Sequence, residues 1–394
     1  MSDLEFMRLA LRLARRGYGA TSPNPMVGAV LVKGGRIIGR GCHRKAGRPH
    51  AEIEALGDAQ RHGCPARGAS LYVTLEPCCT HGRTPPCTEA IIAAGIQHVF
   101  AGATDPNPNH AGKGFEILRR AGIEVSRGLL ADECARLNEA FNHWIVNRTP
   151  FVTVKAAMTL DGKIATAGGE SKWITGEKAR ALGMKLRLGS DAILVGVNTV
   201  LADDPSLTVR MNAAKRDGRV AKSIRRLVLD SMARTPLTAR VVSDEQAALT
   251  TIIVSQYAPK NRVAALGKRV NVLVAPTTKP SSSATRLPSL NLPWVLKKLG
   301  AEHVTRLLVE GGGEVNASFL LGRLAQRVAF FYAPKVLGGS DARRGVAGDG
   351  ARNLSDVIQL REVQWRKVGD DLLLTAVIQP GASWESAGKL IPAG

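Results

Sequence analysis

The chain has 394 residues, of which 44% are hydrophobic, 22% are charged and 4% are aromatic, and its formal net charge is +21. This length exceeds one ordinary hydrophobic core and predicts two domains, and the composition is typical of soluble globular proteins. The sequence contains no run of eighteen apolar residues, so we expect no membrane-spanning helix and no membrane partner. Six irregularly placed cysteines are too few for a disulfide framework, which favours a cytoplasmic protein whose clustered cysteines bind metal.

The basic charge fits two classes of partner, nucleic acid and small phosphorylated substrates. The sequence has no basic stripe interleaved with aromatic side chains, which single-strand binding needs, so we expect no nucleic-acid partner. The densest basic run, KRDGRVAKSIRR at 215–226, is interpreted as a solvated loop between two strand-like segments. A second loop, rich in serine and proline, is predicted at 279–289.

The first part of the chain alternates strand-like and helix-like segments. The N-terminus predicts an amphipathic helix opened by a Ser2/Glu5 capping box, and its scattered arginines argue against a signal peptide. Apolar, β-branched segments predict strands at 26–32, 36–41, 70–77 and 98–106. Helical patterns are found at 50–62, 84–94, 112–121 and 132–147. The alternation indicates an α/β layer fold, and the Arg-Thr-Pro sequence after the last helix marks the end of a domain near residue 148.

The rest of the chain repeats the strand theme with helices between the strands. Strand-like segments are found at 151–158, 191–197, 225–231, 250–255, 270–276, 304–313, 328–339 and 370–380. The sequence therefore predicts two α/β domains of unequal size, residues 1–148 and 149–394, without internal repeats.

Two stretches of the first domain carry residues suited to zinc chemistry. GRPHAEIEAL at 47–56 places His50 and Glu52 at the start of a helix, and Cys78 and Cys87 follow a strand. Catalytic zinc takes three protein ligands and leaves a fourth position to water, so His50, Cys78 and Cys87 are the expected ligands. Glu52 is then the expected acid and base that moves the water's proton. The pattern matches the H-x-E and P-C of zinc nucleobase deaminases, although the ligand cysteines are spaced C-x8-C instead of C-x2-C.

The cysteines have an alternative interpretation, because buried cysteines are commonly inert core residues and a lone H-x-E occurs by chance. Cys87 argues against it, since two prolines place this residue in the first turn of a helix, where a thiolate is favoured. Cys79 is interpreted as structural. The remaining cysteines are predicted to be core residues, namely Cys42, Cys64 and Cys134.

The motifs resemble those of a known family. SPNPMVGAVLV, PHAE, EPCCTHGRTPPC and DPNP resemble the bifunctional pyrimidine deaminase and reductase of riboflavin biosynthesis. KAAMTLDGKIAT, GESKWITG, VGVNTVLADDPSLTVR and VEGGGEVNASFL resemble the reductase half of the same family. The resemblance spans nearly the whole chain. It implies a cytidine-deaminase-like three-layer domain followed by a dihydrofolate-reductase-like domain.

The resemblance also implies substrate-binding residues in the first domain. These are Asn24, His43, Arg83, Asp105 and Asn107. Their chemistry agrees, because amides and carboxylates can contact a pyrimidine edge and a guanidinium suits phosphate. Asp105 and Asn107 have an alternative role in turn formation beside Pro106 and Pro108.

In the second domain, a glycine run follows an apolar strand and opens a helix, where a backbone can approach a phosphate. The run does not fit G-x-G-x-x-G, and a simple turn would also explain it. The resemblance makes it an NADPH pyrophosphate site formed by Gly312, Gly313, Glu314, Val315, Asn316, Ala317 and Ser318. It adds five cofactor contacts, Ala157, Trp173, Thr199, Asp203 and Ser231. It assigns the ribosyl phosphate substrate to Ser171, Arg187, Leu207, Arg210 and Glu310. Lys155 either stabilises developing negative charge or is a surface lysine.

The activity implied by the resemblance has two steps. Zinc-dependent hydrolytic deamination of 2,5-diamino-6-(5-phosphoribosylamino)pyrimidin-4-one is followed by NADPH reduction of the ribosyl group, giving 5-amino-6-(5-phosphoribitylamino)uracil. We expect one zinc per chain, a phosphorylated pyrimidine as substrate and a homo-oligomer. Two other hypotheses stay open: a zinc deaminase acting on a flipped nucleic-acid base, which leaves the second domain unexplained, and a non-catalytic zinc module, which would use four protein ligands.

Overall fold

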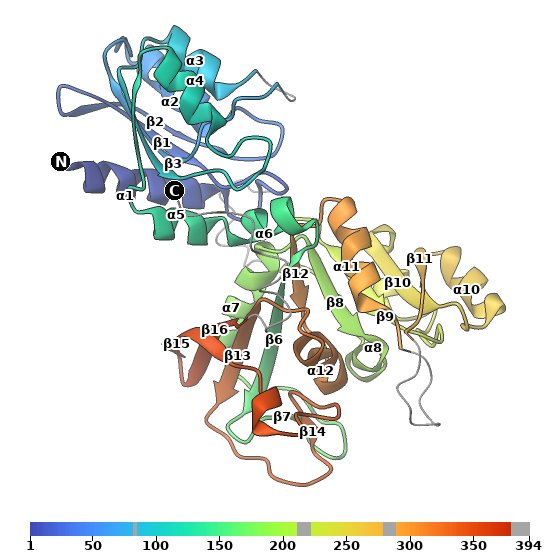
Figure 1. Ribbon diagram of the computed structural model, residues 1–394. Coiled ribbons are helices and arrows are strands. Elements are labelled where there is room, and N and C mark those ends of the chain that lie inside the picture. Colours follow the sequence, from blue (N-terminus) through green and yellow to red (C-terminus); the bar gives the residue numbers. More distant parts are fainter. Residues whose placement is uncertain (82–84, 211–221, 279–288, 380–394) are drawn as a thin grey trace. The chain divides into compact units, whose positions relative to one another are not determined.

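The computed structural model describes residues 1–81, 85–210, 222–278 and 289–379 (Figure 1). The chain divides into two compact units, which are considered separately below. The first unit contains residues 1–150 together with 300–305, and the second contains residues 151–299 and 306–394. The first unit thus includes a short segment from late in the sequence.

The first unit is built on a five-stranded sheet with the order β2-β1-β3-β4-β5. Its strands are β1 (Gly28–Lys33), β2 (Arg36–Cys42), β3 (Ser70–Leu75), β4 (His98–Ala103) and β5 (Glu124–Arg127). β1 is antiparallel to both β2 and β3, whereas β3, β4 and β5 are parallel. The carboxyl end of β3 leads directly to Glu76 and the cysteine segment.

Helices cover both faces of this sheet. They are α1 (Asp3–Ala14), α2 (Ala51–Arg61), α3 (Cys87–Ala93), α4 (Lys113–Arg120), α5 (Ala131–Leu137) and α6 (Glu139–Asn147). Alternate strand residues enter two cores, since α2, α3 and α4 pack with Leu31, Val73 and Val99, while α1 and α5 pack with Val30 and Tyr72. This arrangement confirms the expected three-layer α/β fold, and the Ser2/Glu5 capping box at the start of α1 is present.

The predicted helix at 132–147 is wrong in one respect, because it is broken into α5 and α6 at Asn138. The buried Asn138 side chain accepts a hydrogen bond from the Met26 N–H at 2.8 Å and donates one to the Met26 carbonyl at 2.9 Å. This tertiary contact holds the chain away from continuous helical geometry. Strand β5 was not predicted; its four residues are mostly exposed and carry little apolar signal.

The second unit is built on a nine-stranded sheet with the order β11-β10-β9-β8-β12-β6-β13-β16-β15 (Figure 1). The strands from β11 to β13 are parallel, and β16 and β15 are added antiparallel. The strand bounds are β6 (Phe151–Thr159), β8 (Ala192–Gly196), β9 (Arg225–Leu229), β10 (Thr250–Ser255), β11 (Asn271–Ala275), β12 (Arg306–Val309), β13 (Arg327–Ala333), β15 (Leu360–Val368) and β16 (Asp371–Ile378). A separate two-stranded sheet pairs β7 (Lys163–Ala165) with β14 (Arg343–Arg344).

The helices of the second unit are α7 (Glu177–Leu188), α8 (Val197–Asp203), α9 (Arg240–Ser243), α10 (Lys260–Gly267), α11 (Leu292–Ala301) and α12 (Gly313–Leu321). One core packs Val200 of α8 and Leu266 of α10 with buried residues of β8, β9 and β10. A smaller core packs α7 with Phe331 of β13 and Leu373 of β16. The glycine run 311–313 lies where β12 ends and α12 begins.

The prediction of a solvated loop at 215–226 is wrong for its last two residues. Residues 215–221 lie outside the described part of the chain, but Arg225 and Arg226 belong to β9. Arg226 is fully buried, and its guanidinium donates to both carboxylate oxygens of Asp244, at 2.6 and 2.7 Å. A buried charge requires such a partner, which the local sequence does not reveal. The predicted 279–289 loop lies outside the described residues except for Ser289.

Two further sequence expectations concern burial and membranes. Cys42 and Cys134 are buried as predicted, whereas Cys64 is only partly buried against the core. Within the described residues, every helix is too short or too polar to cross a membrane.

Candidate active sites

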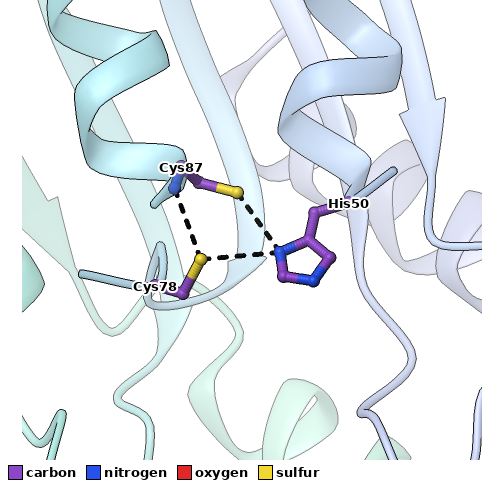
Figure 2. A group of neighbouring side chains, drawn as sticks. All are labelled: His50, Cys78 and Cys87. Carbon is purple, nitrogen blue, oxygen red and sulfur yellow. Dashed lines mark hydrogen bonds between the residues drawn. The ribbon is translucent and has the colours of Figure 1, made fainter. Parts of the chain in front are cut away.

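Three side chains from separate elements of the first unit converge on one point (Figure 2). His50 is the N-cap residue of α2, Cys78 follows β3, and Cys87 opens α3. The His50 Nδ1 lies 3.5 Å from the Cys78 sulfur and 3.3 Å from the Cys87 sulfur, and the three ligand atoms lie within 4.8 Å of one another. One imidazole nitrogen and two sulfurs suit zinc and leave a fourth position for water. The donor set therefore fits a catalytic zinc ion.

The protonation of these three groups is coupled. The Cys87 side chain, followed by His50, lowers the pKa of Cys78 to about 4, and the Cys87 backbone N–H also donates to the Cys78 sulfur at 3.3 Å. The same contact raises the pKa of Cys87, and the contact with Cys78 raises the pKa of His50. These contacts thus favour ionisation of the Cys78 sulfur and protonation of Cys87 and His50. A metal cation that binds there would displace those protons.

Glu52 lies in the first turn of α2, two residues after His50, and only 3% of its surface is exposed. Burial raises the pKa of Glu52 to about 7, and the charge of Cys78 adds to this effect. Its carboxyl group makes a hydrogen bond with the Cys87 side chain. Glu52 is therefore beside the three donor atoms and outside their group, as an acid or base should be.

A cavity of about 300 Å³ lies against this cluster, and we call it the cluster cavity. Its lining includes Glu52 and four of the predicted substrate residues, Asn24, His43, Asp105 and Asn107. The fifth, Arg83, lies outside the described residues. The volume is at the lower end of the range for small-molecule sites.

His43 is fixed in this cavity by hydrogen bonds on both ring nitrogens. The Nδ1 lies 3.1 Å from the Pro49 carbonyl and the Nε2 lies 3.2 Å from the Asn24 amide nitrogen. A carbonyl only accepts and an amide nitrogen only donates, so the Nδ1 carries the proton. Burial lowers the pKa of His43, which favours this neutral form.

Asp105 and Asn107 form a turn and also line the cluster cavity, so neither of the roles considered for them is ruled out. The Asn107 N–H donates to Asp105 Oδ1 at 2.9 Å, which forms a turn, and both residues line the cluster cavity. The turn is held by Glu76, which the sequence analysis missed. Its buried carboxylate accepts N–H groups from Asp105, Gly112 and Gly114 at 3.1, 3.0 and 2.9 Å. An acidic residue at the end of a buried strand, directly before Pro-Cys, was the available signal.

Other lining residues of the cluster cavity were also missed. They include His110, Phe141, Trp144, Ile145 and His303. Phe141, Trp144 and Ile145 come from α6, and His303 comes from the 300–305 segment of the first unit. Cys79, interpreted as structural, is half-buried with its sulfur 3.6 Å from His110 Nδ1, outside the three-ligand group.

The second unit has a cavity of about 660 Å³ at the start of α12, which we call the glycine-run cavity. Eight predicted cofactor residues line it, namely Thr199, Asp203, Ser231, Gly312, Gly313, Glu314, Val315 and Ser318. Asn316 and Ala317 do not, because they lie on the buried face of α12. Ser171, expected at the substrate, lines this cavity instead and donates to Asp203 Oδ1 at 3.0 Å.

The two central glycines of this run differ in their surroundings. A Cβ on Gly313 would lie 2.3 Å from the Arg344 carbonyl oxygen, whereas a Cβ on Gly312 would meet only Thr199 Oγ1, at 3.9 Å. Gly313 is thus required by the close approach of β14, and Gly312 faces open space at the cavity. The open backbone at a helix N-terminus is suited to a phosphate.

A second cavity of this unit, about 810 Å³, is lined by Lys155, Ala157, Trp173, Arg187, Arg210 and Glu310, and we call it the Glu310 cavity. Ala157 and Trp173, expected at the cofactor, are thus found with the predicted substrate residues. Leu207 is buried and lines neither cavity.

An ion-pair group forms the polar part of the Glu310 cavity. Arg187 donates to both Glu310 oxygens, at 2.8 and 2.9 Å, and the Lys155 ammonium lies 3.8 Å from Glu310. Burial would raise the pKa of Glu310, but Arg187 and Lys155 outweigh it and hold this pKa at about 2. Lys155 is only 20% exposed, so it is not a surface lysine.

Comparison with known proteins identifies both halves. Residues 1–103 match the cytidine and deoxycytidylate deaminase zinc-binding region, and residues 150–374 match the RibD C-terminal domain. The riboflavin biosynthesis protein RibD of Actinobacillus pleuropneumoniae is 44% identical over 386 residues, which cover 96% of each chain. This chain belongs to the RibD family. The RibD of Aquifex aeolicus is 43% identical over 374 residues, or 94% of this chain and 97% of that protein.

Solved RibD structures share the architecture. The Acinetobacter baumannii RibD, form 1, has a TM-score of 0.82 at 36% identity and covers 96% of this chain and 99% of its own. A Thermotoga maritima diaminohydroxyphosphoribosylaminopyrimidine deaminase/5-amino-6-(5-phosphoribosylamino)uracil reductase has a TM-score of 0.79, with the same identity and coverage. The RibD-family chain is a bifunctional deaminase and reductase of riboflavin biosynthesis, with a zinc-binding deaminase region and an NADPH-dependent reductase domain.

Proposed function

We propose that this enzyme deaminates 2,5-diamino-6-(5-phosphoribosylamino)pyrimidin-4-one and then reduces the ribosyl group to ribityl, with residues 1–148 as the deaminase domain and 149–394 as the reductase domain. The observation that carries this proposal is the convergence of His50, Cys78 and Cys87 beside the buried Glu52. Three ligands with an adjacent carboxylate are the minimum set for hydrolytic deamination.

In the deaminase reaction, His50, Cys78 and Cys87 would hold zinc, and the bound ion would supply an acidified water molecule. Glu52 would move both protons of the attacking water, the first to the ring nitrogen and the second to the amino group, which leaves as ammonia. Its burial excludes bulk water from this transfer. Asn24, His43, Asp105 and Asn107 contact the pyrimidine, because their amide, imidazole and carboxylate groups line the same cavity as Glu52.

In the reductase reaction, residues of the glycine-run cavity would hold NADPH, with Gly312 and Gly313 toward its pyrophosphate, and the cofactor would supply the hydride. The Glu310 cavity holds the ribosyl phosphate substrate. Arg210 lines this cavity and is available to the phosphate. Arg187 is already bonded to Glu310, so its part is to hold that carboxylate ionised and in place. Lys155 adds positive charge beside the substrate, where alignment and charge govern the rate.

Three expectations complete the proposal: the enzyme acts in the cytoplasm, assembles as a homo-oligomer and does not act on nucleic acid. The phosphorylated pyrimidine accounts for a basic protein as well as a nucleic acid would. RNA binding at physiological salt that exceeds background would argue for the nucleic-acid deaminase instead.

The direct test is incubation of the purified protein with the diaminopyrimidine substrate, with and without NADPH, followed by mass spectrometry. Without NADPH, the product should show replacement of an amino group by oxygen. With NADPH, a gain of two hydrogens should follow. Reduction without any deamination would overturn the first step of the proposal.

A further inference from the structure

The 300–305 segment is fixed against the deaminase unit by specific contacts. The Trp144 indole N–H of α6 donates to the Gly300 carbonyl at 2.8 Å, and the hydroxyls of Ser22 and Thr305 lie 3.1 Å apart. A Cβ on Gly300 would lie 2.1 Å from the Arg148 carbonyl oxygen, so this close approach requires glycine. A segment that follows residues 151–299 of the second unit is therefore a fixed part of the first unit.

His303 of this segment lines the cluster cavity. Its ring centroid lies 5.7 Å from that of Trp144, at an interplanar angle of 59°. His303 is exposed, whereas Glu52 and His43 are 3% and 2% exposed. The cavity thus runs from a buried floor, where the deamination chemistry is placed, to a rim that includes His303.

The charge of the substrate determines which end of the cavity its phosphate occupies. A phosphate dianion next to the Glu52 carboxylate and the cysteine sulfurs would be repelled and would lose its hydration. The reacting carbon must nevertheless lie beside Glu52. The phosphoribosyl tail therefore extends toward the exposed rim.

Among the described lining residues, only histidines can carry a positive charge, and the other ring N–H, that of Trp144, is already donated to the Gly300 carbonyl. His50 belongs to the group of three donor side chains with Cys78 and Cys87, and both ring nitrogens of His43 are hydrogen-bonded. The ring of His110 lies 3.6 Å from the Cys79 sulfur and 3.3 Å from the Thr80 hydroxyl. Within the described part of the chain, the ring nitrogens of His303 have no such partner, which leaves them available to a ligand.

We propose that His303 is a positioning residue of the deaminase, donating a ring N–H to the phosphate of its substrate. This inference rests on the proposed deamination of a phosphoribosyl pyrimidine. It makes the deaminase site dependent on a residue encoded within the reductase half of the sequence.

The test removes the imidazole without disturbing the backbone. His303 has a φ of 62°, in the left-handed region that glycine and asparagine tolerate best, so His303→Gly and His303→Asn are suitable variants. With the phosphorylated substrate, KM for deamination should rise about tenfold with little change in kcat, the scale of one hydrogen bond to a charged group. With the dephosphorylated compound, KM should equal that of the wild type.

Two controls and the contrary outcomes complete the experiment. His62→Asn removes an exposed imidazole at the C-terminal end of α2 that does not line the cluster cavity, and it should leave both KM values unchanged. NADPH oxidation with the deaminated intermediate should also be unchanged in the His303 variants. An equal rise in KM with both substrates would show that His303 only shapes the cavity, and it would overturn the inference. An unchanged KM with both substrates would overturn it as well. A wild-type protein that deaminates neither substrate would instead overturn the proposed function.

Discussion

The two units organise their chemistry in different ways. In the deaminase unit, three donor atoms within 4.8 Å of one another and a buried carboxylate meet at a cavity of about 300 Å³. In the reductase unit, two cavities of about 660 and 810 Å³ are bordered by open backbone and an ion-pair group. The difference follows from the source of the reactive groups. In the proposed assignment, hydrolysis depends on side chains that hold zinc and move protons, whereas NADPH brings its own hydride and needs space and alignment.

This comparison predicts different sensitivities. The first unit should respond to the loss of a single atom or charge at the cluster. The second unit should respond to changes in the shape of its cavities and to the loss of the Glu310 charge, which holds Arg187 in place.

The largest effect is expected for Cys87→Ser, which replaces the sulfur of a proposed zinc ligand by a hydroxyl oxygen, a poorer ligand. The variant should lose most of its zinc and its deaminase activity, because three protein ligands are the minimum at such a site. NADPH oxidation with the deaminated intermediate should persist. Elemental analysis gives the zinc content per chain, and Cys79→Ser is the control that should keep about one zinc. Equal zinc loss in both variants would contradict the assignment of the ligands.

The next largest effect is expected for Glu52→Gln, which keeps the size of the side chain but cannot accept a proton. Deamination should fall by about 10²-fold or more, the scale of a lost acid or base. The zinc content should not change, because Glu52 is outside the three-ligand group. The same variant should oxidise NADPH at the wild-type rate when given the deaminated intermediate. If a folded, zinc-loaded variant lost both activities, the assignment of two separate sites would be wrong and a shared active site would explain the result.

Much of the fold is predictable because its signals are local. Pro86 and the apolar pattern place α3 within a few residues, and the Ser2/Glu5 box places α1. The errors arise where a distant partner decides the outcome. Asn138 breaks a helix through its contact with Met26, and Arg226 is buried because Asp244 lies opposite. Neither partner can be identified from the neighbouring sequence.

The candidate sites follow the same rule. His50, Glu52, Cys78 and Cys87 occur in two short motifs, so their chemistry is readable before their positions are known. His303 lies in another part of the sequence and reaches the cavity only through tertiary contacts. In the reductase unit, the family resemblance predicts cofactor contacts along the whole segment 312–318. Because the segment is helical, Asn316 and Ala317 instead face the core.

A stability effect of intermediate size is expected for Glu310→Gln, which leaves Arg187 buried without its carboxylate. The second unit should lose about 3 kcal/mol of unfolding free energy at neutral pH. The folded-state pKa of Glu310, about 2, is below its unfolded value, so the stabilisation is complete above the unfolded pKa of about 4.3. It is lost as the pH falls toward about 2. The difference between wild type and variant should therefore be constant from about pH 5 to 8 and should narrow below about pH 4.

Hydrogen exchange of β6 and β12 peptides at increasing urea concentration measures this effect within one unit, with α2 peptides as an internal reference. The control is Asp204→Asn, which removes an exposed carboxylate that lies 3.3 Å from Arg240. That pair should contribute less than about 1 kcal/mol. If both variants lost the same unfolding free energy, the buried Glu310–Arg187 pair would contribute no more to stability than the exposed Asp204–Arg240 pair.

The smallest effect is expected for Gly312→Val, and it separates a cofactor site from a simple turn. Gly312 has a φ of −70°, which valine can adopt, and its Cβ would enter open space at the cavity. The fold should therefore be kept while NADPH affinity falls about tenfold, the scale of a local steric clash. Gly313→Ala is the matched contrast, because its Cβ would lie 2.3 Å from the Arg344 carbonyl oxygen and should destabilise the packing of β14. Equilibrium titration with NADPH and a melting curve for each variant distinguish the two effects. If Gly312→Val bound NADPH as tightly as the wild type, the glycine run would serve only as a turn between β12 and α12.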